Sequence, residues 1–115
     1  MSDVWQDVCS IEDLVTDSGV CSLINGKQVA LFNVKNEDGE HIYALQNYDP
    51  FGKANVLYRG LLGSSEEQIF VASPLYKQRF CLSTGQCLDE DSVSIATFAA
   101  KVLDGRVLVK TTSIS

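Results

Sequence analysis

One segment organises this chain of 115 residues: Ala72-Ser-Pro-Leu-Tyr-Lys-Gln-Arg-Phe-Cys-Leu-Ser-Thr-Gly-Gln-Cys87. Its second half, residues 79–86, is typical of a strand that runs into a turn containing glycine. Its first half, residues 73–77, is a short loop with an early proline, and it follows an expected strand at residues 68–72. The pattern therefore predicts a loop held between two strands.

This segment resembles the second ligand loop of Rieske ferredoxins, in which Cys-Pro-x-His-Gly is followed by a Phe and a Thr-Gly turn. Here Ser73 stands at the Cys position, Tyr76 at the His position and Lys77 at the Gly position. An earlier segment resembles the first ligand loop, Cys-Pro-His, with Asp49 at the Cys position and Phe51 at the His position. The resemblance implies a Rieske-like scaffold in which all four cluster-ligand positions carry other residues.

Two longer strings, residues 43–51 and 73–80, are similar to one branch of this family, the small subunits of cytoplasmic NADH-dependent nitrite reductases. The resemblance extends from Trp5 to Val109. In that branch the large subunit carries the flavin (FAD), an iron–sulfur cluster and sirohaem, and it reduces nitrite to ammonium with NADH. The small subunit is a Rieske-type domain that has lost its metal ligands. The resemblance therefore implies a non-catalytic subunit in nitrogen metabolism (nitrate assimilation), with no cofactor in this chain and the large subunit as its partner.

The composition independently indicates a single globular domain over residues 1–115. Hydrophobic residues make up 45% of the chain and charged residues 21%, which is ordinary for a globular protein. The net charge of -6, without a cluster of Lys or Arg, argues against nucleic acid and anionic membranes as partners. The sequence has no apolar run near the roughly 20 residues of a membrane helix and no signal-peptide pattern at its start. We therefore expect a cytoplasmic protein.

The sequence predicts no catalytic or metal site. The four cysteines form no Cys-x-x-Cys pair, so we expect small, mostly buried thiols rather than ligands. The one histidine, His41, follows a turn and is expected as a partly exposed strand residue, so no catalytic triad is predicted. A Rieske centre needs two thiolates and two imidazoles, and the residues at its four positions supply neither. Hard oxygen donors such as those of Asp49 and Tyr76 do not select an iron–sulfur cluster.

Short strands with turn signals between them predict an all-β fold. Asn25-Gly26, the Asn36–Gly39 segment and Asp104-Gly105 are each typical of a hairpin turn. Six to eight short strands at this spacing favour an antiparallel β-sandwich or small barrel. The expected strands are 4–8, 19–24, 28–34, 41–47, 68–72, 79–82, 95–103 and 106–110, with a capped helical turn at 10–14.

The middle region, residues 49–67, shows no strand pattern and is long for an irregular loop. We therefore expect part of it to pack against the domain, with Val56-Leu57 and Leu61-Leu62 as the apolar anchors. In the Rieske-like fold that the resemblance implies, the loops 48–52 and 73–78 lie side by side at one end of the domain, which we call the tip.

Two interpretations of the tip remain open. Its apolar side chains either fill the space of the missing cluster or form a patch that docks a partner, with basic residues at its rim. Two alternatives for the whole protein also stay open: a free-standing interaction or regulatory module and, disfavoured by the missing ligands, a ferredoxin-type electron carrier. The predicted docking residues are Tyr48, Phe51, Leu75, Tyr76, Lys77 and Arg79, with Lys53 and Arg59 as further basic residues of the rim.

Overall fold

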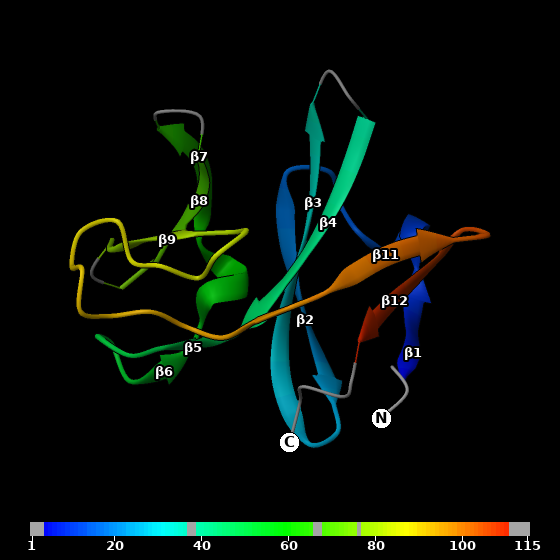
Figure 1. The fold of residues 1–115 in the computed structure, drawn as a ribbon, viewed down its shortest axis with the longest axis horizontal. Coiled ribbons are helices and arrows are strands. Elements are labelled where there is room, and N and C mark those ends of the chain that lie inside the picture. The colour runs from blue at the N-terminus through cyan, green and yellow to red at the C-terminus, as the bar shows by residue number, and fades with distance from the viewer. Residues whose placement is uncertain (1–3, 37–38, 66–67, 76, 111–115) are drawn as a thin grey trace.

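The computed structural model describes residues 4–36, 39–65, 68–75 and 77–110, and these residues form an almost entirely antiparallel β structure (Figure 1). The predicted fold class is confirmed. The predicted six to eight strands were too few, because short two-residue strands form where the sequence shows no alternation. The described strands are β1 (Trp5–Ser10), β2 (Ser18–Ile24), β3 (Lys27–Asn36), β4 (Gly39–Gln46), β5 (Tyr48–Asp49), β6 (Ala54–Asn55), β7 (Leu61–Ser65), β8 (Gln68–Ala72), β9 (Arg79–Cys81), β10 (Thr97–Phe98), β11 (Ala100–Leu103) and β12 (Arg106–Lys110).

Two predicted hairpin turns are confirmed in detail. Asn25 and Gly26 connect β2 to β3 with φ values of 51° and 78°. Asp104 and Gly105 connect β11 to β12 with φ values of 51° and 77°. Two consecutive residues with positive φ are the signature of the tight turn that matches the twist of a hairpin. The third predicted turn joins β3 to β4, which pair as expected, but its residues 37–38 lie outside the described part of the chain.

The predicted capped turn is a short 3-10 helix, η1 (Ile11–Asp13). The side chain of Ser10 accepts the N–H of Glu12 at 3.2 Å, and the carboxylate of Asp13 accepts the N–H of Ser10 at 3.1 Å. This reciprocal arrangement satisfies amides that the end of a helix leaves unpaired. The capped helix η1 directly follows the end of β1. Neither η1 nor η2, the two described helices, has the length or apolar character of a membrane span.

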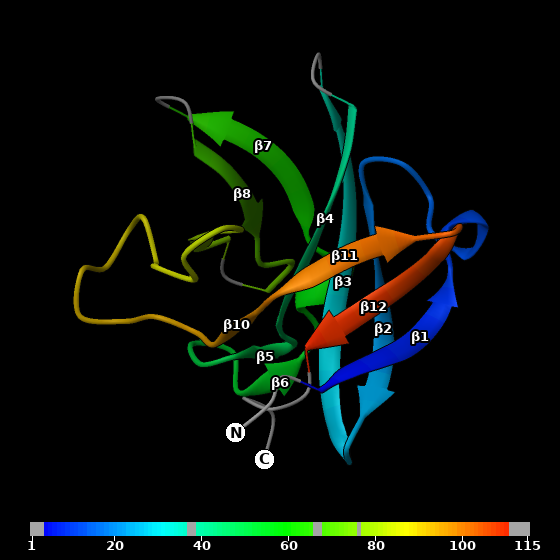
Figure 2. The same ribbon diagram turned by 45° about the vertical axis from the view of Figure 1, so that its right-hand side comes forward.

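The central layer is the four-stranded sheet β10-β4-β3-β2, which is covered on both faces. Side chains on β3 alternate between two hydrophobic clusters because successive residues of a strand point to opposite faces. Val29 and Leu31 pack toward the outer sheet β1-β12-β11, whereas Ala30 and Phe32 pack toward the lobe built from β7, β8 and β9. Figures 1 and 2 show this lobe on one side of the central sheet and the outer sheet on the other.

The middle region is more ordered than the sequence indicated. It contains the paired strands β5 and β6, a second 3-10 helix η2 (Leu57–Arg59) and the strand β7. Leu57 is completely buried, which confirms one anchor. Leu61 was wrongly predicted as another, because its side chain is 79% exposed. It lies on β7, which is the edge strand of the sheet β7-β8-β9 among the described strands, so this leucine has solvent beside it.

The expected strand 95–103 is divided at Ala99, and this division connects two sheets. Before Ala99, β10 pairs with β4 of the central sheet. After it, β11 pairs with β12 of the outer sheet. The chain therefore leaves one sheet and enters the other within a few residues, and β4 and β11 run apart from this point (Figure 1).

Candidate functional site

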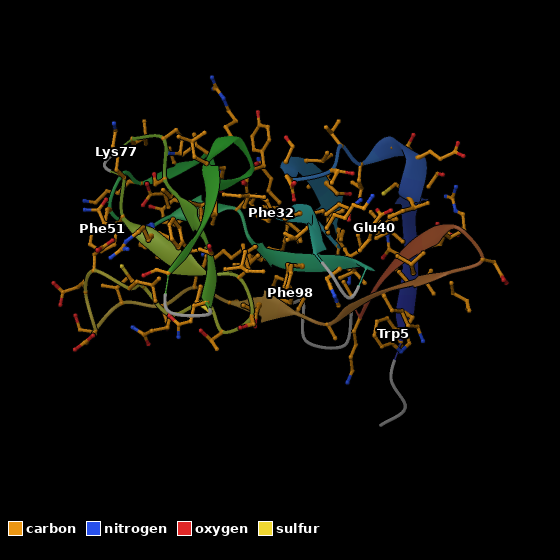
Figure 3. All side chains as sticks on the ribbon, turned by 90° about the horizontal axis from the view of Figure 1, so that it is seen from above. Trp5, Phe32, Glu40, Phe51, Lys77 and Phe98 are labelled. Carbon is orange, nitrogen blue, oxygen red and sulfur yellow. The ribbon has the colours of Figure 1, made fainter. Side chains whose placement is uncertain are left out.

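The two loops at the Rieske ligand positions meet, as predicted. The first follows β5 and contains Asp49 and Phe51, and the second connects β8 to β9 and begins with Ser73. The hydroxyl of Ser73 donates a short hydrogen bond to Oδ2 of Asp49, and both residues are almost completely buried. Figure 3 shows Phe51 and Lys77, one from each loop, close together at one end of the molecule. The two residues that the resemblance to Rieske ferredoxins places at the thiolate positions are therefore bonded to each other.

The polar groups of both loops are largely satisfied within the tip. The other carboxylate oxygen of Asp49 accepts the N–H of Phe51 at 2.9 Å, and its carbonyl accepts the N–H of Lys53 at 2.7 Å. In the second loop the hydroxyl of Ser73 accepts the N–H of Leu75 at 3.2 Å, and its carbonyl accepts the N–H of Lys77 at 3.0 Å. These are turns in which a short polar side chain bonds the backbone two residues ahead. The loops are held by their own hydrogen bonds.

The apolar side chains of the two loops differ in how deeply they are buried. The ring of Phe51 packs on Phe80, with ring centroids 6.2 Å apart, and lies partly buried against the core cluster of the lobe. Leu75 is 47% exposed. It also lies so close to Gly52 that a Cβ at this glycine would come within 2.4 Å of its Cδ1. Phe51 thus fills interior space beneath the tip, while Leu75 presents apolar surface outside it.

Two lysines at the tip adopt the left-handed backbone conformation. Lys53 has φ of 55° and Lys77 has φ of 65°, and Lys77 is exposed. This conformation favours glycine, which explains why the Rieske ferredoxin pattern has glycine at the position of Lys77. Tyr48, on β5, is half-buried and pairs with Asn55 of β6. Tyr76 lies outside the described residues.

Arg79 is held by an ion pair rather than left free at the rim. Its guanidinium lies 2.8 Å from Asp89, its backbone N–H donates to the same carboxylate at 2.8 Å, and it also sits over the ring of Phe70. Hydrogen bonds from the Arg79 side chain and backbone lower the pKa of the Asp89 carboxyl below its usual 3.8. The same pair raises the already high pKa of Arg79. The negative charge of Asp89 therefore offsets the positive charge of Arg79, which was predicted to lie free at the rim of the docking surface.

Asn47 joins β6 and η2 to the central sheet, a role that the sequence did not reveal. It is completely buried, and its Nδ2 donates to Oε1 of Gln28 at 3.2 Å and to the carbonyl of Asn55 at 3.0 Å. Its Oδ1 accepts the N–H of Tyr58 at 2.8 Å, and its carbonyl accepts the N–H of Leu57. One amide thus connects β3, β6 and η2. No local pattern marks such a residue, because its partners lie on separate elements.

The donors at the tip do not fit a Rieske [2Fe–2S] cluster. A cluster of this type takes two thiolates and two imidazoles. Asp49 and Ser73 offer hard oxygens that already bond each other, and Phe51 has no donor atom. Among the described residues, no group of three His, Cys, Asp or Glu side chains is placed to hold a metal ion.

The cysteines do not replace the missing ligands. All four are free thiols, with Cys81 and Cys87 buried in the lobe and Cys9 and Cys21 partly buried. Burial raises the pKa of the Cys9 and Cys21 thiols. Burial also acts to raise the pKa of Cys81, but hydrogen bonds from the turn at Ser83 outweigh it and the net shift is downward. The prediction of mostly buried thiols is confirmed for Cys81 and Cys87.

Comparison with known proteins agrees with this geometry. The model of the Rieske-like [2Fe-2S] domain family matches residues 4–110. The chain belongs to this family. Among Rieske-like domains it is 42% identical over 106 residues to the nitrite reductase (NADH) small subunit of Salmonella typhimurium, covering 92% of this chain and 96% of that one. The NMR structure of the E. coli protein NirD superposes with a TM-score of 0.85 at 38% identity, covering 97% of this chain and all of that one.

Two further relatives show how this Rieske-like domain occurs elsewhere. It matches 105 residues of the nitrite reductase [NAD(P)H] large subunit of Klebsiella oxytoca at 37% identity, which is 91% of this chain and 11% of that one. It is also 31% identical over 111 residues to the ferredoxin component of a naphthalene 1,2-dioxygenase/salicylate 5-hydroxylase system from Ralstonia, covering 96% of this chain and 98% of that one. The family therefore includes small subunits, a part of a larger chain and a ferredoxin.

Proposed function

We propose that this Rieske-like domain is the non-catalytic small subunit of an NADH-dependent nitrite reductase and that it holds no iron–sulfur cluster. The observation that carries the proposal is the buried hydrogen bond between Ser73 and Asp49 at the two thiolate positions. Phe51 supports it because its ring takes up interior space where the ligand pattern has an imidazole. The choice of nitrite reductase as the enzyme rests on the identity of 42% to a nitrite reductase (NADH) small subunit.

The partner in this proposal is a large subunit that carries FAD, sirohaem and an iron–sulfur cluster and reduces nitrite to ammonium in the cytoplasm. The Klebsiella relative supports this choice, because there a domain similar to this chain is continuous with a nitrite reductase large subunit. A domain found within the same polypeptide in one organism and as a separate chain in another is expected to work beside the same neighbour. The small subunit then contributes a binding surface for the large subunit rather than a catalytic step.

The tip is the docking surface in this proposal. Leu75 offers exposed apolar area, and Lys77 places an exposed positive charge next to it. Interfaces are anchored by a few apolar or aromatic residues, and rim charges chiefly steer the encounter. Because Arg79 forms an ion pair with Asp89, we assign the electrostatic steering of the large subunit to Lys77 rather than to Arg79. The remaining members of the predicted surface are Tyr48, Phe51 and Tyr76.

Titration of small-subunit variants onto the purified large subunit tests the docking surface. We expect Leu75→Ala and Tyr76→Ala each to weaken association by about 2 kcal/mol, the loss typical of an anchor residue. Lys77→Ala should weaken it less, and mostly at low salt. Leu23→Ala is the matched control, because Leu23 is an exposed leucine (68%) on β2. Unchanged binding of both anchor variants would place the interface elsewhere.

An electron-carrying ferredoxin is the second candidate, favoured by the identity of 31% to the Ralstonia ferredoxin component. The donor set at the tip argues against it, because neither a carboxylate nor a hydroxyl replaces a thiolate in such a cluster. Iron and sulfide analysis after anaerobic reconstitution distinguishes the two candidates. We expect no stoichiometric iron, and a Rieske-type visible spectrum would favour the carrier.

A further inference from the structure

Among the described strands, the outer edge of β4 is unpaired over part of its length. β10 pairs with β4 only at Ala44 and Leu45, so in the described part of the chain the preceding half of β4 pairs on one side only. In an antiparallel ladder the backbone groups of alternate residues point to opposite sides. Since the Gln46 N–H reaches the carbonyl of Ala96 on the outer side, the groups of Ile42 and Glu40 also point outward. These groups face away from β3.

The outer edge of β11 is likewise unpaired as far as the described residues extend, because β11 is the last strand of the sheet β1-β12-β11. Lys110 donates its N–H to the carbonyl of Ala99 at 2.9 Å, so Ala99 bonds toward β12. By alternation the N–H and C=O groups of Ala100 and Val102 point away from β12. Two such edges, one from each sheet, therefore diverge from Ala99, and Figure 1 shows β4 and β11 running apart.

A cleft of about 350 Å³ lies between these edges. Val102 is on the same face of β11 as Ala100, which packs against the core, yet its side chain is 43% exposed. The next residue, Leu103, is 56% exposed. Exposed apolar residues on an unpaired edge strand are a template for pairing with another strand. The cleft is lined by Glu40, His41, Ile42, Tyr43, Ala100, Lys101 and Val102.

The Klebsiella relative, in which a domain similar to this chain is part of a larger polypeptide, indicates which kind of segment reaches this edge. In the Klebsiella large subunit, the rest of the polypeptide must join a domain like this one at its first or last strand. Here those strands lie together, because Trp5 pairs with Lys110 in the sheet whose outer strand is β11. Two strand spacings separate β1 from β11, which is about 10 Å or about three extended residues. Chain leaving the domain on either side therefore starts within reach of the open edge.

We propose that the outer edge of β11 binds an extended segment of the large subunit as an added β-strand. The inference rests on the proposed function and adds a second contact surface to the tip. The backbone groups of Ala100 and Val102 supply the hydrogen bonds, and the side chain of Val102 is covered by an apolar residue of the incoming strand. Recognition of this kind draws affinity from main-chain bonds and specificity from alternate side chains.

A second copy of the chain fits this edge less well than a different strand. When two β11 strands pair antiparallel about Lys101, the two lysines lie directly opposite, and like charges in that position are destabilising. The net charge of -6 on each copy adds a general repulsion. Lysine on an edge strand is a common device against self-pairing.

Replacing Val102 with proline tests the edge without breaking the hairpin. Val102→Pro removes an N–H that points away from β12, a position at which edge strands tolerate proline. We expect binding to the large subunit to weaken about tenfold, which is the upper end of the usual effect of one lost hydrogen bond. Val102→Ile is the matched control, because it keeps the N–H and an apolar β-branched side chain, and it should bind within about threefold of wild type. Circular dichroism verifies that both variants fold.

Amide hydrogen exchange of the wild-type complex gives a second measurement that needs no variant. The amides of Ala100 and Val102 should exchange at least about tenfold more slowly in the complex than in the free small subunit. Binding without protection, together with full binding of Val102→Pro, would overturn this inference and leave the proposed function intact. Failure of wild type to bind would overturn both. Protection that rises with the concentration of the small subunit alone would replace the large subunit by a second copy as the occupant.

Discussion

The hydroxyl of Ser73 donates a hydrogen bond to the buried carboxylate of Asp49, and this contact joins the two loops whose counterparts in Rieske ferredoxins carry the cluster's thiolates. In a Rieske protein the metal cluster connects the loops. Here a direct bond between two side chains does so. Protein atoms alone therefore join the two loops, and we expect the stability of the tip to depend on this pair.

Ser73→Ala should lower the free energy of unfolding by about 1–3 kcal/mol. The substitution leaves a buried carboxylate with one fewer donor, and an unsatisfied buried polar group carries a cost of this size. Ser92→Ala is the control, because Ser92 also donates to a carboxylate, at 3.0 Å to Glu90, but at an exposed position. That change should stay within about 0.5 kcal/mol of wild type. Urea unfolding measures both, and equal stabilities would show that the Ser73 contact contributes little.

Asn47→Ala should be more damaging, with a loss of about 3 kcal/mol in unfolding free energy, because it removes three part-buried hydrogen bonds of a completely buried side chain. The affected groups belong to β3, β6 and η2. Asn55→Ala serves as the comparison, since the side chain of Asn55 is exposed and only its carbonyl takes part in the network. If Asn47→Ala unfolds at the same urea concentration as Asn55→Ala, Asn47 does not hold β6 and η2 to the central sheet.

The ion pair of Arg79 and Asp89 predicts a pH dependence of stability. The hydrogen bonds from Arg79 place the folded-state pKa of Asp89 below its usual 3.8, so the carboxylate contributes stability above that pH. The contribution is lost as the pH falls through 3.8 and below the folded-state value. The stability difference between wild type and Asp89→Asn should therefore be present at pH 7 and shrink below pH 4. A difference that grows on acidification would contradict this assignment.

Restoring the four ligands should restore cluster binding, since the two loops still meet. We expect the quadruple variant Asp49→Cys, Phe51→His, Ser73→Cys and Tyr76→His to take up about two iron and two sulfide per chain on anaerobic reconstitution. The triple variant that keeps Phe51 is the control and should not show the Rieske-type spectrum. A folded quadruple variant that remains free of iron would mean that these positions do not match the Rieske ligands in space.

Local signals in the sequence predicted much of the fold. Asn25-Gly26 and Asp104-Gly105 specify their turns by backbone conformation alone, and the sequence places strands on either side of each. The meeting of the two loops followed from the resemblance to Rieske ferredoxins. It could not have come from periodicity, because Asp49 and Ser73 are far apart in the chain.

The remaining features depend on contacts between distant segments. Leu61 has the character of a core residue, but whether β7 lies at an edge is decided by which strands pair. Asn47 looks like the end of a strand, and its role arises only when β6 and η2 fold over it. The same holds for Arg79, whose partner Asp89 follows the turn after β9. Sequence patterns report local preference, and these features are tertiary.

We propose that the domain acts by contact and without a metal. A chelator-treated, iron-free small subunit is added to the isolated large subunit, and complex formation and NADH-dependent nitrite turnover are measured. We expect the iron-free protein to bind and to support turnover as fully as the untreated protein, and to reduce no nitrite alone. Turnover that requires a cluster-loaded small subunit would show that the domain acts through a metal.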